Sequence, residues 1–376
     1  MRILEKISHR ANLTARKYLT NLLVPEVKLE EQYKNSQRVK LPCSGQTICI
    51  PETQQMNFFR EIKHLQAATY SLPDIYTITL HDVTYCAKFD ILLTKTRKVI
   101  SDSINTTIEQ NKYSVAENTY FNKVEKISGV CAVFRSFANG YYHQLIDNLP
   151  RISLLNQPQY QEIKEIKLLA STKITKSEEF LLSKILPDNV KLTLLSPDKN
   201  YEIENLIFPS FLTRRHAGYL PSDYLRFFTA KVKPQRPRKK INRIFISRRA
   251  AKKGRHILNE DELFDMLSKY GFKKYVLEQI SVEEQIALFN DSEYVIGSHG
   301  AGLSNIIFAE EIDVLEIFPT KEILPHFYFL AKSLEHNYQY WCGQATSKNS
   351  NFVVNVSDIE KIIASHKIYP TQSFDR

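Results

Sequence analysis

Residues 294–303 read Tyr-Val-Ile-Gly-Ser-His-Gly-Ala-Gly-Leu, and this stretch decides the fold of the second half of the chain. An apolar strand runs into a turn of small residues, and the turn opens a helix expected over 302–308. The first backbone N–H groups of a helix lack partners within it and carry the positive end of its dipole. The turn therefore predicts a site for a phosphate or diphosphate, with His299 as a further hydrogen-bond donor or cation. The alternative is a tight turn in which glycine only permits packing.

Strands and helices alternate on both sides of this turn. Short runs of branched and aromatic residues are separated by longer segments with apolar residues at helical spacing. Such alternation predicts a largely parallel sheet of Rossmann type. The expected strands are 243–247, 275–277, 294–297, 314–318 and 338–341, and the expected helices are 259–270, 281–290, 302–308 and 326–334. Two of these helices begin with the spacing of a capping box, Asn259 with Glu262 and Ser281 with Glu284.

The first half of the chain is expected to be rich in strands over 45–135 and to alternate from about residue 129. The expected strands are 75–80, 85–93, 130–135, 166–170, 190–195 and 206–208, and the expected helices are 141–149, 177–186 and 222–232. The segment 231–240, KVKPQRPRKK, has two prolines and six basic residues, so it predicts a domain boundary. We expect a helix over 1–24, a first domain over 25–232, a linker over 233–242, a second domain over 243–345 and a tail with a helix over 346–376.

The composition is that of a basic globular protein. The 376 residues are 43% hydrophobic and 24% charged, which excludes a disordered tail, a collagen-like repeat and a coiled-coil rod. A net charge of +10 favours an anionic partner, which can be nucleic acid, acidic lipid or a phosphorylated small molecule. The five cysteines are scattered and contain no C-x-x-C pair, so we expect neither a zinc site nor a disulfide framework.

The first 24 residues predict a basic amphipathic helix. The apolar residues of its expected face are Ile3, Leu4, Ile7, Ala11, Ala15, Tyr18, Leu19 and Leu22. Such a helix can lie on an anionic membrane surface, or it can pack on its own domain or on a partner subunit. No continuous apolar core precedes a small-residue cleavage site, so we expect no secretory signal. We expect a cytoplasmic protein, with peripheral contact at the inner face of the membrane as an open alternative.

Charged residues gather at the expected carboxyl ends of the strands, which is where ligands bind in open α/β sheets. Arg248 and Arg249 follow the first strand of the second domain, and Arg255 comes soon after. Arginine is the usual residue for bidentate phosphate recognition. Glu316 lies in an otherwise apolar strand, where a carboxylate is costly unless it is paired. We expect Glu316 to hold a ligand hydroxyl or an arginine; the alternative is an internal Glu–Arg pair that serves structure only.

A second cluster lies in the first domain. His143 and Asp147 are four residues apart and share one face of the helix expected over 141–149. Such a pair can act as a base and its orienting partner, or hold a hydroxyl together. An exposed pair without a catalytic role is the alternative. Pro150 is expected to kink or end the helix, which leaves the placement of Arg151 open.

Five segments carry a resemblance to a known family in their order and spacing as well as in their residues: HQLIDNLPR (143–151), FISRR (245–249), GRHILNEDEL (254–263), VIGSHGAGLSNIIF (295–308) and VLEIFP (314–319). Across roughly residues 75–345, the chain resembles glycosyltransferase family 61. The resemblance implies a GT-B arrangement, in which two Rossmann-like domains face each other across a cleft and the second binds a nucleotide-sugar. The β-rich N-terminal region is extra, and transfer in this family is inverting.

The resemblance also assigns roles to residues. The positions that it places at the donor are Arg248, Arg255, Ser298, His299, Gly300, Ala301, Gly302, Asn305 and Glu316, and it places His143 and Asp147 on the acceptor side. Inverting transfer needs a base for the attacking hydroxyl and positive groups for the leaving diphosphate. We expect Asp147 to be the base, assisted by His143. We expect Arg248, Arg255 and the helix start after His299 to stabilise the diphosphate.

We therefore expect an enzyme that transfers a sugar from a nucleotide diphosphate-sugar to a hydroxyl of an oligosaccharide or polysaccharide. We also expect the membrane anchor of eukaryotic members to be lacking, so the chain looks more like bacterial members tied to capsule or exopolysaccharide assembly. No cofactor is expected, and a divalent cation stays open, although the second domain has no Asp-x-Asp. One alternative is a non-catalytic protein that binds glycan or nucleotide. The other, a nucleic-acid-binding protein, lacks a stacking platform, a zinc knuckle and a helix-turn-helix.

Overall fold

A computed structural model describes residues 25–34, 36, 38–42, 44–49, 69–105, 111–138, 140–171, 174–213, 219–319, 324–344 and 350–366. The helix expected over 1–24 lies outside these residues. The chain divides into two compact units, Met1–Gln46 with Leu72–Arg215 and Thr47–Ser71 with His216–Arg376. The boundary between the units precedes the helix at 222–232, whereas the basic segment singled out in the sequence follows that helix. No described helix is both long enough and apolar enough to cross a membrane.

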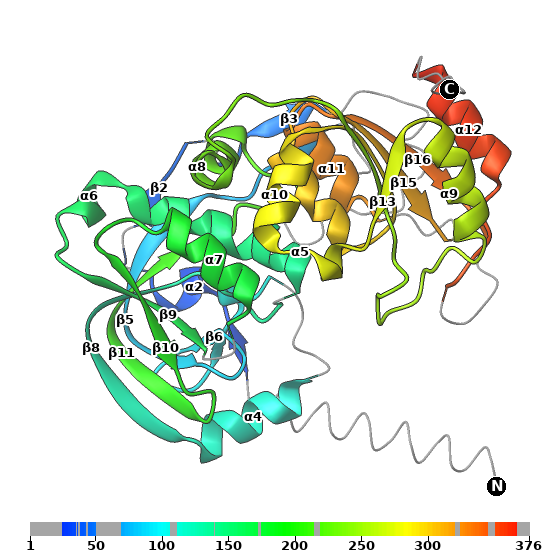
Figure 1. Ribbon diagram of the computed structural model, residues 1–376. Helices are drawn as coiled ribbons and strands as arrows, with labels where there is room; N and C mark the ends of the chain where they lie inside the picture. Colours follow the sequence, from blue (N-terminus) through cyan, green and yellow to red (C-terminus); the bar gives the residue numbers. More distant parts are fainter. Residues whose placement is uncertain are drawn as a thin grey trace, which may run out of the picture. The chain divides into compact units, whose positions relative to one another are not determined.

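A mixed nine-stranded sheet forms the frame of the first unit (Figure 1). Its strands are β1 (Glu26–Val27), β2 (Arg38–Lys40), β5 (Tyr76–Cys86), β6 (Ile91–Leu93), β7 (Val99–Ile100), β8 (Lys123–Val133), β9 (Ile166–Ser171), β10 (Val190–Leu195) and β11 (Lys199–Pro209). The order is β1-β7-β6-β5-β11-β8-β9-β10, and β2 pairs with β5. From β11 to β10 every pairing is parallel, whereas β5 runs antiparallel to β11, β6 and β2. The sheet thus joins a strand-rich start to βα units.

The helices of the first unit cover this sheet or follow its strand ends. They are α2 (Leu29–Gln32), η2 (Ser101–Ser103), α4 (Lys112–Phe121), α5 (Tyr141–His143), the π-helix η4 (Gln144–Asn148), the 3₁₀-helix η5 (Leu149–Asn156), α6 (Pro158–Gln161) and α7 (Lys176–Ile185). A capping box between Thr175 and Glu178 starts α7. The apolar core of the unit includes Leu80, Ile203 and Phe208 from the two central strands.

Strand β5 is continuous, although its sequence suggests a break between residues 80 and 85. His81 and Asp82 interrupt the apolar pattern there, and both side chains are exposed. Successive side chains of a regular strand point to opposite faces, but Asp82 has a φ of 53°, so the alternation is interrupted and both polar side chains are exposed while the strand continues. The predicted break was therefore wrong, and the strand runs through it.

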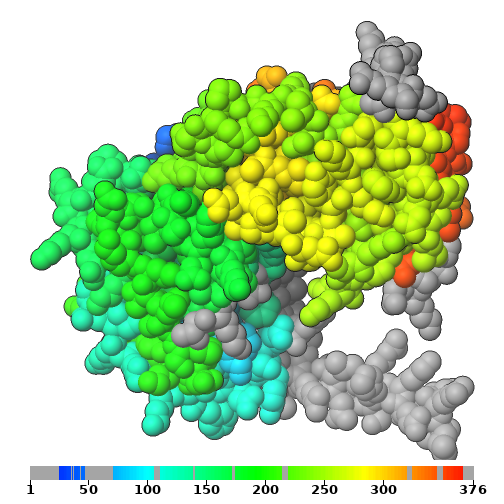
Figure 2. Space-filling view, viewed as in Figure 1, coloured from blue at the N-terminus to red at the C-terminus, as the bar shows by residue number. Residues whose placement is uncertain are grey.

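The second unit contains the five-stranded parallel sheet that the alternation predicts, in the order β13-β12-β14-β15-β16. The strands are β12 (Asn242–Ile246), β13 (Phe272–Tyr275), β14 (Ser292–Ser298), β15 (Asp313–Phe318) and β16 (Asn337–Cys342). The helices are α8 (Ser222–Val232), α9 (Glu260–Lys269), η6 (Leu277–Gln279), α10 (Val282–Asn290), the 3₁₀-helix η7 (Ala301–Phe308), α11 (His326–Ser333) and α12 (Val356–Ser365). Figure 2 shows the yellow segment around α10 at the surface of this unit. A short antiparallel pair, β3 (Thr47–Cys49) with β4 (Thr69–Ser71), is grouped with it.

The two expected capping boxes of the second unit have different outcomes. The box at Ser281 and Glu284 is confirmed at the start of α10. The side chain of each residue accepts a hydrogen bond from the backbone N–H of the other. At α9 the side chain of Asn259 makes no capping bond. Its amide and carbonyl instead bind the backbone of Val354, at 2.9 Å each, and so hold the segment before α12. The spacing at Asn259 was misleading because a segment 95 residues away competes for the same side chain.

Candidate functional site

The first cluster of candidate residues lies in the second unit, after the carboxyl ends of β12 and β14. Arg248 follows β12, and its Nη2 donates to the carbonyl oxygens of Lys253 at 3.0 Å and Gly254 at 3.5 Å. Its guanidinium rests against the backbone of Gly300, where an added β-carbon would stand 1.8 Å from Nη1. The Nε of Arg248 has no hydrogen-bond partner among the described residues. The turn after β14 and the arginine after β12 therefore pack against each other.

Two half-buried cations lie close together here. Burial, and to a smaller extent the positive charge of Arg255, lowers the pKa of Arg248 to about 10. Burial also lowers the pKa of Arg255, while the carboxylate of Glu316 opposes that shift. Both side chains stay charged at neutral pH, and within the described ranges neither has a carboxylate within 4.0 Å. Such a desolvated pair of like charges is costly and is relieved by an anionic ligand.

Arg255 is also held in an unusual backbone conformation. Its φ is 62°, in the left-handed region that residues with a β-carbon rarely adopt. The hydroxyl of Ser298 donates to the carbonyl oxygen of Arg255 at 3.1 Å and ties this conformation to the end of β14. Strained residues of this kind gather at ligand sites, where the surrounding structure holds them in place.

His299 is fixed by a carboxylate and by aromatic rings. Its Nδ1 contacts Oε1 of Glu316, and its ring stacks on Phe318 at 5.2 Å and meets Phe327 edge-on at 5.5 Å. The other oxygen of Glu316 accepts a 2.5 Å hydrogen bond from the hydroxyl of Tyr338. Glu316 therefore has partners other than the arginine or ligand hydroxyl expected from the sequence. It orients His299, whose Nε2 has no hydrogen bond to the part of the chain that the structure describes.

The remaining residues expected at the donor have supporting positions. The side chain of Asn305 is fully buried, and its Nδ2 donates to Gln285 and to the carbonyl of Gly302, each at 3.0 Å. Ala301 begins η7, so the expected helix start is present, although it has 3₁₀ geometry. Arg249 binds Glu260 at 2.9 Å and Asp261 at 2.5 Å, and so does not join Arg248.

The second cluster lies in the first unit, and its side chains make more hydrogen bonds than the sequence suggests. Nδ1 of His143 lies 2.6 Å from Oδ2 of Asp147, and Oγ1 of Thr213 donates to Oδ1 at 2.9 Å. Asp147 is buried, whereas the side chain of His143 is 31% exposed. Asp147 lies in the π-helix η4 rather than in the expected α-helix, and π-turns occur frequently at functional sites. Thr213 could not be found from local sequence because it is 66 residues away.

Arg151 lies buried behind this pair. Its guanidinium donates to the carbonyl oxygens of Phe134 at 2.9 Å and Pro209 at 3.1 Å, and it stacks on the ring of Phe211 at 4.1 Å. Burial lowers the pKa of Arg151 to about 9, and the carboxylate of Asp147 acts in the opposite direction. Pro150 does not stop the chain from turning, because η5 continues to Asn156. A fixed positive charge therefore supports the negative charge of Asp147.

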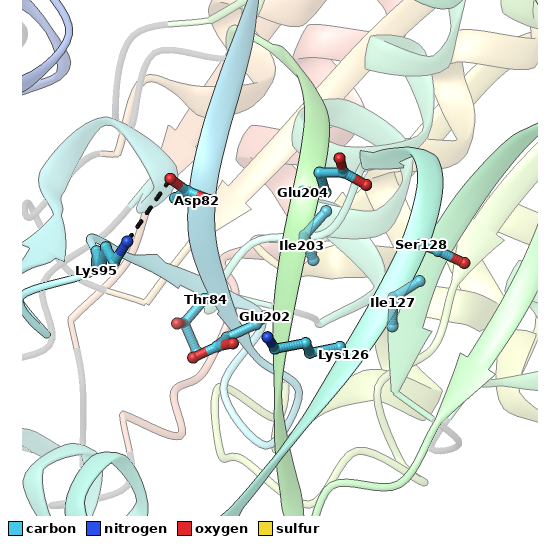
Figure 3. A pocket seen from close by; sticks show the side chains of 9 residues that line it. All are labelled: Asp82, Thr84, Lys95, Lys126, Ile127, Ser128, Glu202, Ile203 and Glu204. Atoms are coloured by element: carbon cyan, nitrogen blue, oxygen red, sulfur yellow. Dashed lines mark ion pairs between the residues drawn. The ribbon is translucent and has the colours of Figure 1, made fainter.

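A hollow of about 400 Å³ lies on the sheet of the first unit, across β5, β11 and β8 (Figure 3). Its lining residues are Asp82, Thr84, Lys95, Lys126, Ile127, Ser128, Glu202, Ile203 and Glu204. It lies where the sheet is irregular, since Asp82 has a φ of 53° and the pairing of β11 with β8 shifts after Ile203. The hollow contains none of the residues expected from the sequence. Three carboxylates against two ammonium groups do not suit a diphosphate.

Comparison with known proteins connects the two clusters with one family. Residues 141–314 match the family model described as Glycosyltransferase 61. The chain is 37% identical over 75 residues to the EGF domain-specific O-linked N-acetylglucosamine transferase of Drosophila melanogaster, which covers 19% of this chain and 14% of that protein. It is 31% identical over 90 residues to the Beta-1,2-xylosyltransferase of Arabidopsis thaliana. This match covers 20% of this chain and 17% of that protein.

The matches therefore span less than a fifth of the length of either relative. The matched residues include His143, Asp147, Arg248, Arg255 and the turn at His299, and they end before Glu316 and Tyr338. Residues 141–314 thus match a glycosyltransferase family 61 domain.

Proposed function

We propose that the chain is an inverting glycosyltransferase that moves a sugar from a nucleotide diphosphate-sugar to a hydroxyl of an oligosaccharide or polysaccharide. The observation that carries this proposal is the pair of half-buried guanidinium groups of Arg248 and Arg255 beside the Gly300 turn. They have no carboxylate within 4.0 Å in the described ranges, and the helix start of η7 adds backbone donors. This is the positive environment that a leaving diphosphate requires.

In the proposed reaction the acceptor hydroxyl gives its proton to Asp147. The hydroxyl oxygen forms a bond to the anomeric carbon while the bond from that carbon to the diphosphate oxygen breaks. The electron pair leaves with the diphosphate, whose growing charge Arg248 and Arg255 stabilise. Attack from the face opposite the leaving group inverts the configuration of the anomeric carbon.

The contacts of Asp147 support its role as the base. His143 and Thr213 each contact one of its oxygens, so the carboxylate is held in one orientation. His143 is the partly exposed member of the pair and can also contact the acceptor. The family resemblance supports a GT-B-like arrangement, in which the acceptor-side domain and the donor-side domain serve one reaction.

Arginine charge supports a transfer that needs no cofactor. Arg248 and Arg255 supply two positive charges where a metal-dependent enzyme uses a divalent cation. Transfer that continues after removal of divalent cations with EDTA is the expected result. Transfer that stops with EDTA and returns with added Mg²⁺ or Mn²⁺ would assign part of the diphosphate charge to a metal.

A nucleic-acid-binding function is less well supported, because the basic segment after α8 is engaged within its own unit. Lys233 pairs with Glu310 at 2.9 Å, and Arg236 pairs with Asp291 at 2.7 Å. Arg238 donates to the carbonyl oxygen of Ser292. We further propose a cytoplasmic location, with contact to the inner face of the membrane through residues 1–24, and a role in assembly of a bacterial capsule or exopolysaccharide.

The test is a ligand panel followed by a transfer assay. Thermal unfolding is measured with nucleoside diphosphates and nucleotide sugars, and the best ligand is expected to raise the melting temperature. At a ligand concentration about 100 times its dissociation constant, the gain in unfolding free energy is about 2.7 kcal/mol. The stabilising nucleotide sugar is then offered with glycan acceptors, and the product's anomeric configuration is read by NMR. Stabilisation without turnover would favour a non-catalytic binding protein, and no stabilisation would overturn the donor site.

A further inference from the structure

The sheet of the second unit has a switch point where the candidate diphosphate residues lie. The strands follow one another in the chain from β12 to β16, but β13 and β14 lie on opposite sides of β12. Ligands of open α/β sheets bind at such a point, outside the carboxyl ends of the strands. Arg248 follows β12, and the turn at Gly300 follows β14. The loop after β13 begins at the same edge of the sheet, because the three strands are parallel.

This loop, which contains η6, is attached to the turn after β14. Nε2 of Gln285 donates to the carbonyl oxygens of Leu277 at 2.9 Å and Ile280 at 3.1 Å. Its Oε1 accepts a 3.0 Å hydrogen bond from Asn305 of η7. The buried side chain of Leu277 also packs on the turn, since its Cδ1 lies 3.0 Å from where a β-carbon of Gly302 would stand. The loop after β13 therefore reaches past β12, and its backbone is held against the turn.

Glu278 is the residue of this loop whose charge acts on the candidate site. It lies between the two carbonyl groups that Gln285 binds, and its side chain is exposed. Burial lowers the pKa of Arg248, and the negative charge of Glu278 acts in the opposite direction. Among the described residues, the Glu278 carboxylate has neither a hydrogen-bond donor nor a cation within 4.0 Å. Glu278 therefore lies near Arg248 without forming an ion pair with it.

A carboxylate near two guanidinium groups has opposite effects on the two halves of a nucleotide. It repels the diphosphate, and so weakens the binding of inorganic pyrophosphate. It also accepts hydrogen bonds from hydroxyl groups, and a bond to an ionised acceptor is about twice as strong as a neutral one. A nucleoside diphosphate offers both groups, because its ribose hydroxyls lie only a few covalent bonds from the diphosphate.

We propose that Glu278 binds the ribose of the nucleotide, with its carboxylate accepting hydrogen bonds from the 2′- and 3′-hydroxyls. This inference rests on the proposed function, in which Arg248 and Arg255 hold the diphosphate of the same nucleotide. It makes the site selective for ribonucleotides over deoxyribonucleotides and over free pyrophosphate. Glu278 lies in none of the five segments that carry the family resemblance.

The alternative is an exposed carboxylate that acts on the site through its charge alone. Removal of that charge would then tighten the binding of every diphosphate to the same degree, with or without a ribose. If Glu278 binds the ribose, its removal weakens the binding of the ribonucleotide and does not weaken the binding of pyrophosphate. The two roles therefore predict changes of opposite sign for the ribonucleotide.

The experiment uses calorimetry to find which of UDP, GDP, ADP and CDP binds the wild type most tightly. Dissociation constants are then measured for that ribonucleotide, for its 2′-deoxy and 3′-deoxy forms and for inorganic pyrophosphate. The variants are Glu278→Ala, Glu278→Gln and the control Glu283→Gln. Glu283 is an exposed carboxylate in the first turn of α10 without a partner in the described ranges, so the control removes a similar charge nearby. Unfolding curves check that each variant is folded.

In the wild type, each deoxy form should bind about tenfold to a hundredfold more weakly than the ribonucleotide, which is the loss expected for a charged hydrogen bond. In Glu278→Ala this difference should disappear, while pyrophosphate should bind at least as tightly as it does to the wild type. Glu278→Gln should keep part of the difference, because an amide oxygen still accepts a weaker hydrogen bond. Glu283→Gln should keep all of it.

A preference for ribose that survives Glu278→Ala, or no such preference in the wild type, overturns the inference and leaves the donor site intact. Equal tightening of all ligands in both Glu278 variants also overturns it, because the carboxylate then acts by charge alone. If none of the four nucleoside diphosphates binds the wild type, the proposed function fails, and this inference fails with it.

Discussion

The guanidinium of Arg248 occupies the place that a side chain at residue 300 would take. A β-carbon added to Gly300 would stand 1.8 Å from Nη1 and 2.9 Å from Cζ of Arg248. The φ of Gly300 is 173°, which is extended backbone that any residue can adopt. Glycine is therefore needed at this position for the space it leaves to the arginine, not for its conformational freedom.

Gly300→Ala should consequently act through Arg248. The backbone tolerates alanine, so the fold should persist, but the guanidinium must leave its place beside the turn. We expect the affinity for a nucleoside diphosphate to fall about tenfold to a hundredfold, the equivalent of about 1.5–3 kcal/mol for a charged hydrogen bond. In the double variant with Arg248→Ala, the two losses should not add. Calorimetry of all four proteins measures this, and additive losses would show that residue 300 acts on the ligand directly.

The arginines after β12 provide a matched comparison. Arg248→Ala and Arg255→Ala should each weaken nucleoside diphosphate binding by about tenfold to a hundredfold, because each removes a charged partner of the ligand. Arg249→Ala should leave binding unchanged, because Arg249 is half exposed and bound to Glu260 and Asp261. The measurement is a dissociation constant for each variant at constant salt. Equal losses in all three would indicate a general effect of positive charge instead of a site.

This contrast also shows what sequence could predict and what it could not. The pattern at 294–303 places His299 just after the carboxyl end of a strand. Sequence could predict this because the apolar strand and the turn that follows it are contiguous in the chain. Arg248 and Arg249 are indistinguishable in sequence, yet they diverge because Asp261 and Glu260 lie beside only one of them. The partners of Glu316 are 17 and 22 residues away and come from other strands. No local pattern contains such pairings.

The π-helix at Gln144–Asn148 escaped prediction for a different reason. The spacing of His143 and Asp147 fits an α-helix equally well, because a single wide turn changes the spacing of only a few residues. What favours the wide turn is contact with distant residues, since Thr213 binds Asp147 and the carbonyl of Pro209 binds Arg151. Sequence therefore indicated which residues form the pair, and tertiary contacts determined its geometry.

Acid should destabilise the second unit through His336. Burial lowers the pKa of His336 to about 4, from an ordinary 6.5, while Nε2 donates to the carbonyl of Ile306 at 3.0 Å. Because the folded pKa lies below the unfolded one, the unfolded state binds the proton more readily. Stability is therefore full above about pH 6.5 and is lost as pH falls toward 4. Between pH 7 and 4.5 the loss from this group is about 2–3 kcal/mol.

Urea denaturation of the wild type and of His336→Gln at these two pH values measures that loss. Glutamine keeps an N–H donor for Ile306 but does not titrate, so its loss of unfolding free energy should be smaller by about 2–3 kcal/mol. Lys233 and Arg238 contribute to the low pKa of His336, and both remain in the variant. Equal losses in the two proteins would mean that His336 is protonated in the folded state.

The catalytic base is tested by separating charge from shape in the first unit. Asp147→Asn keeps the size of the side chain but removes the basic carboxylate, so transfer should fall by roughly 10²–10⁴ while donor affinity barely changes. His143→Ala should cost less, because His143 orients the base through a 2.6 Å contact instead of accepting the proton. Thr213→Val, which removes the bond to Oδ1, should also give a smaller loss than Asp147→Asn. The readouts are kcat for transfer and the dissociation constant of the donor, with unfolding curves to confirm the fold.

A greater loss in His143→Ala than in Asp147→Asn would make His143 the base and Asp147 its orienting partner. Near wild-type turnover in both would make the pair structural, and His299 would then be the next group to test.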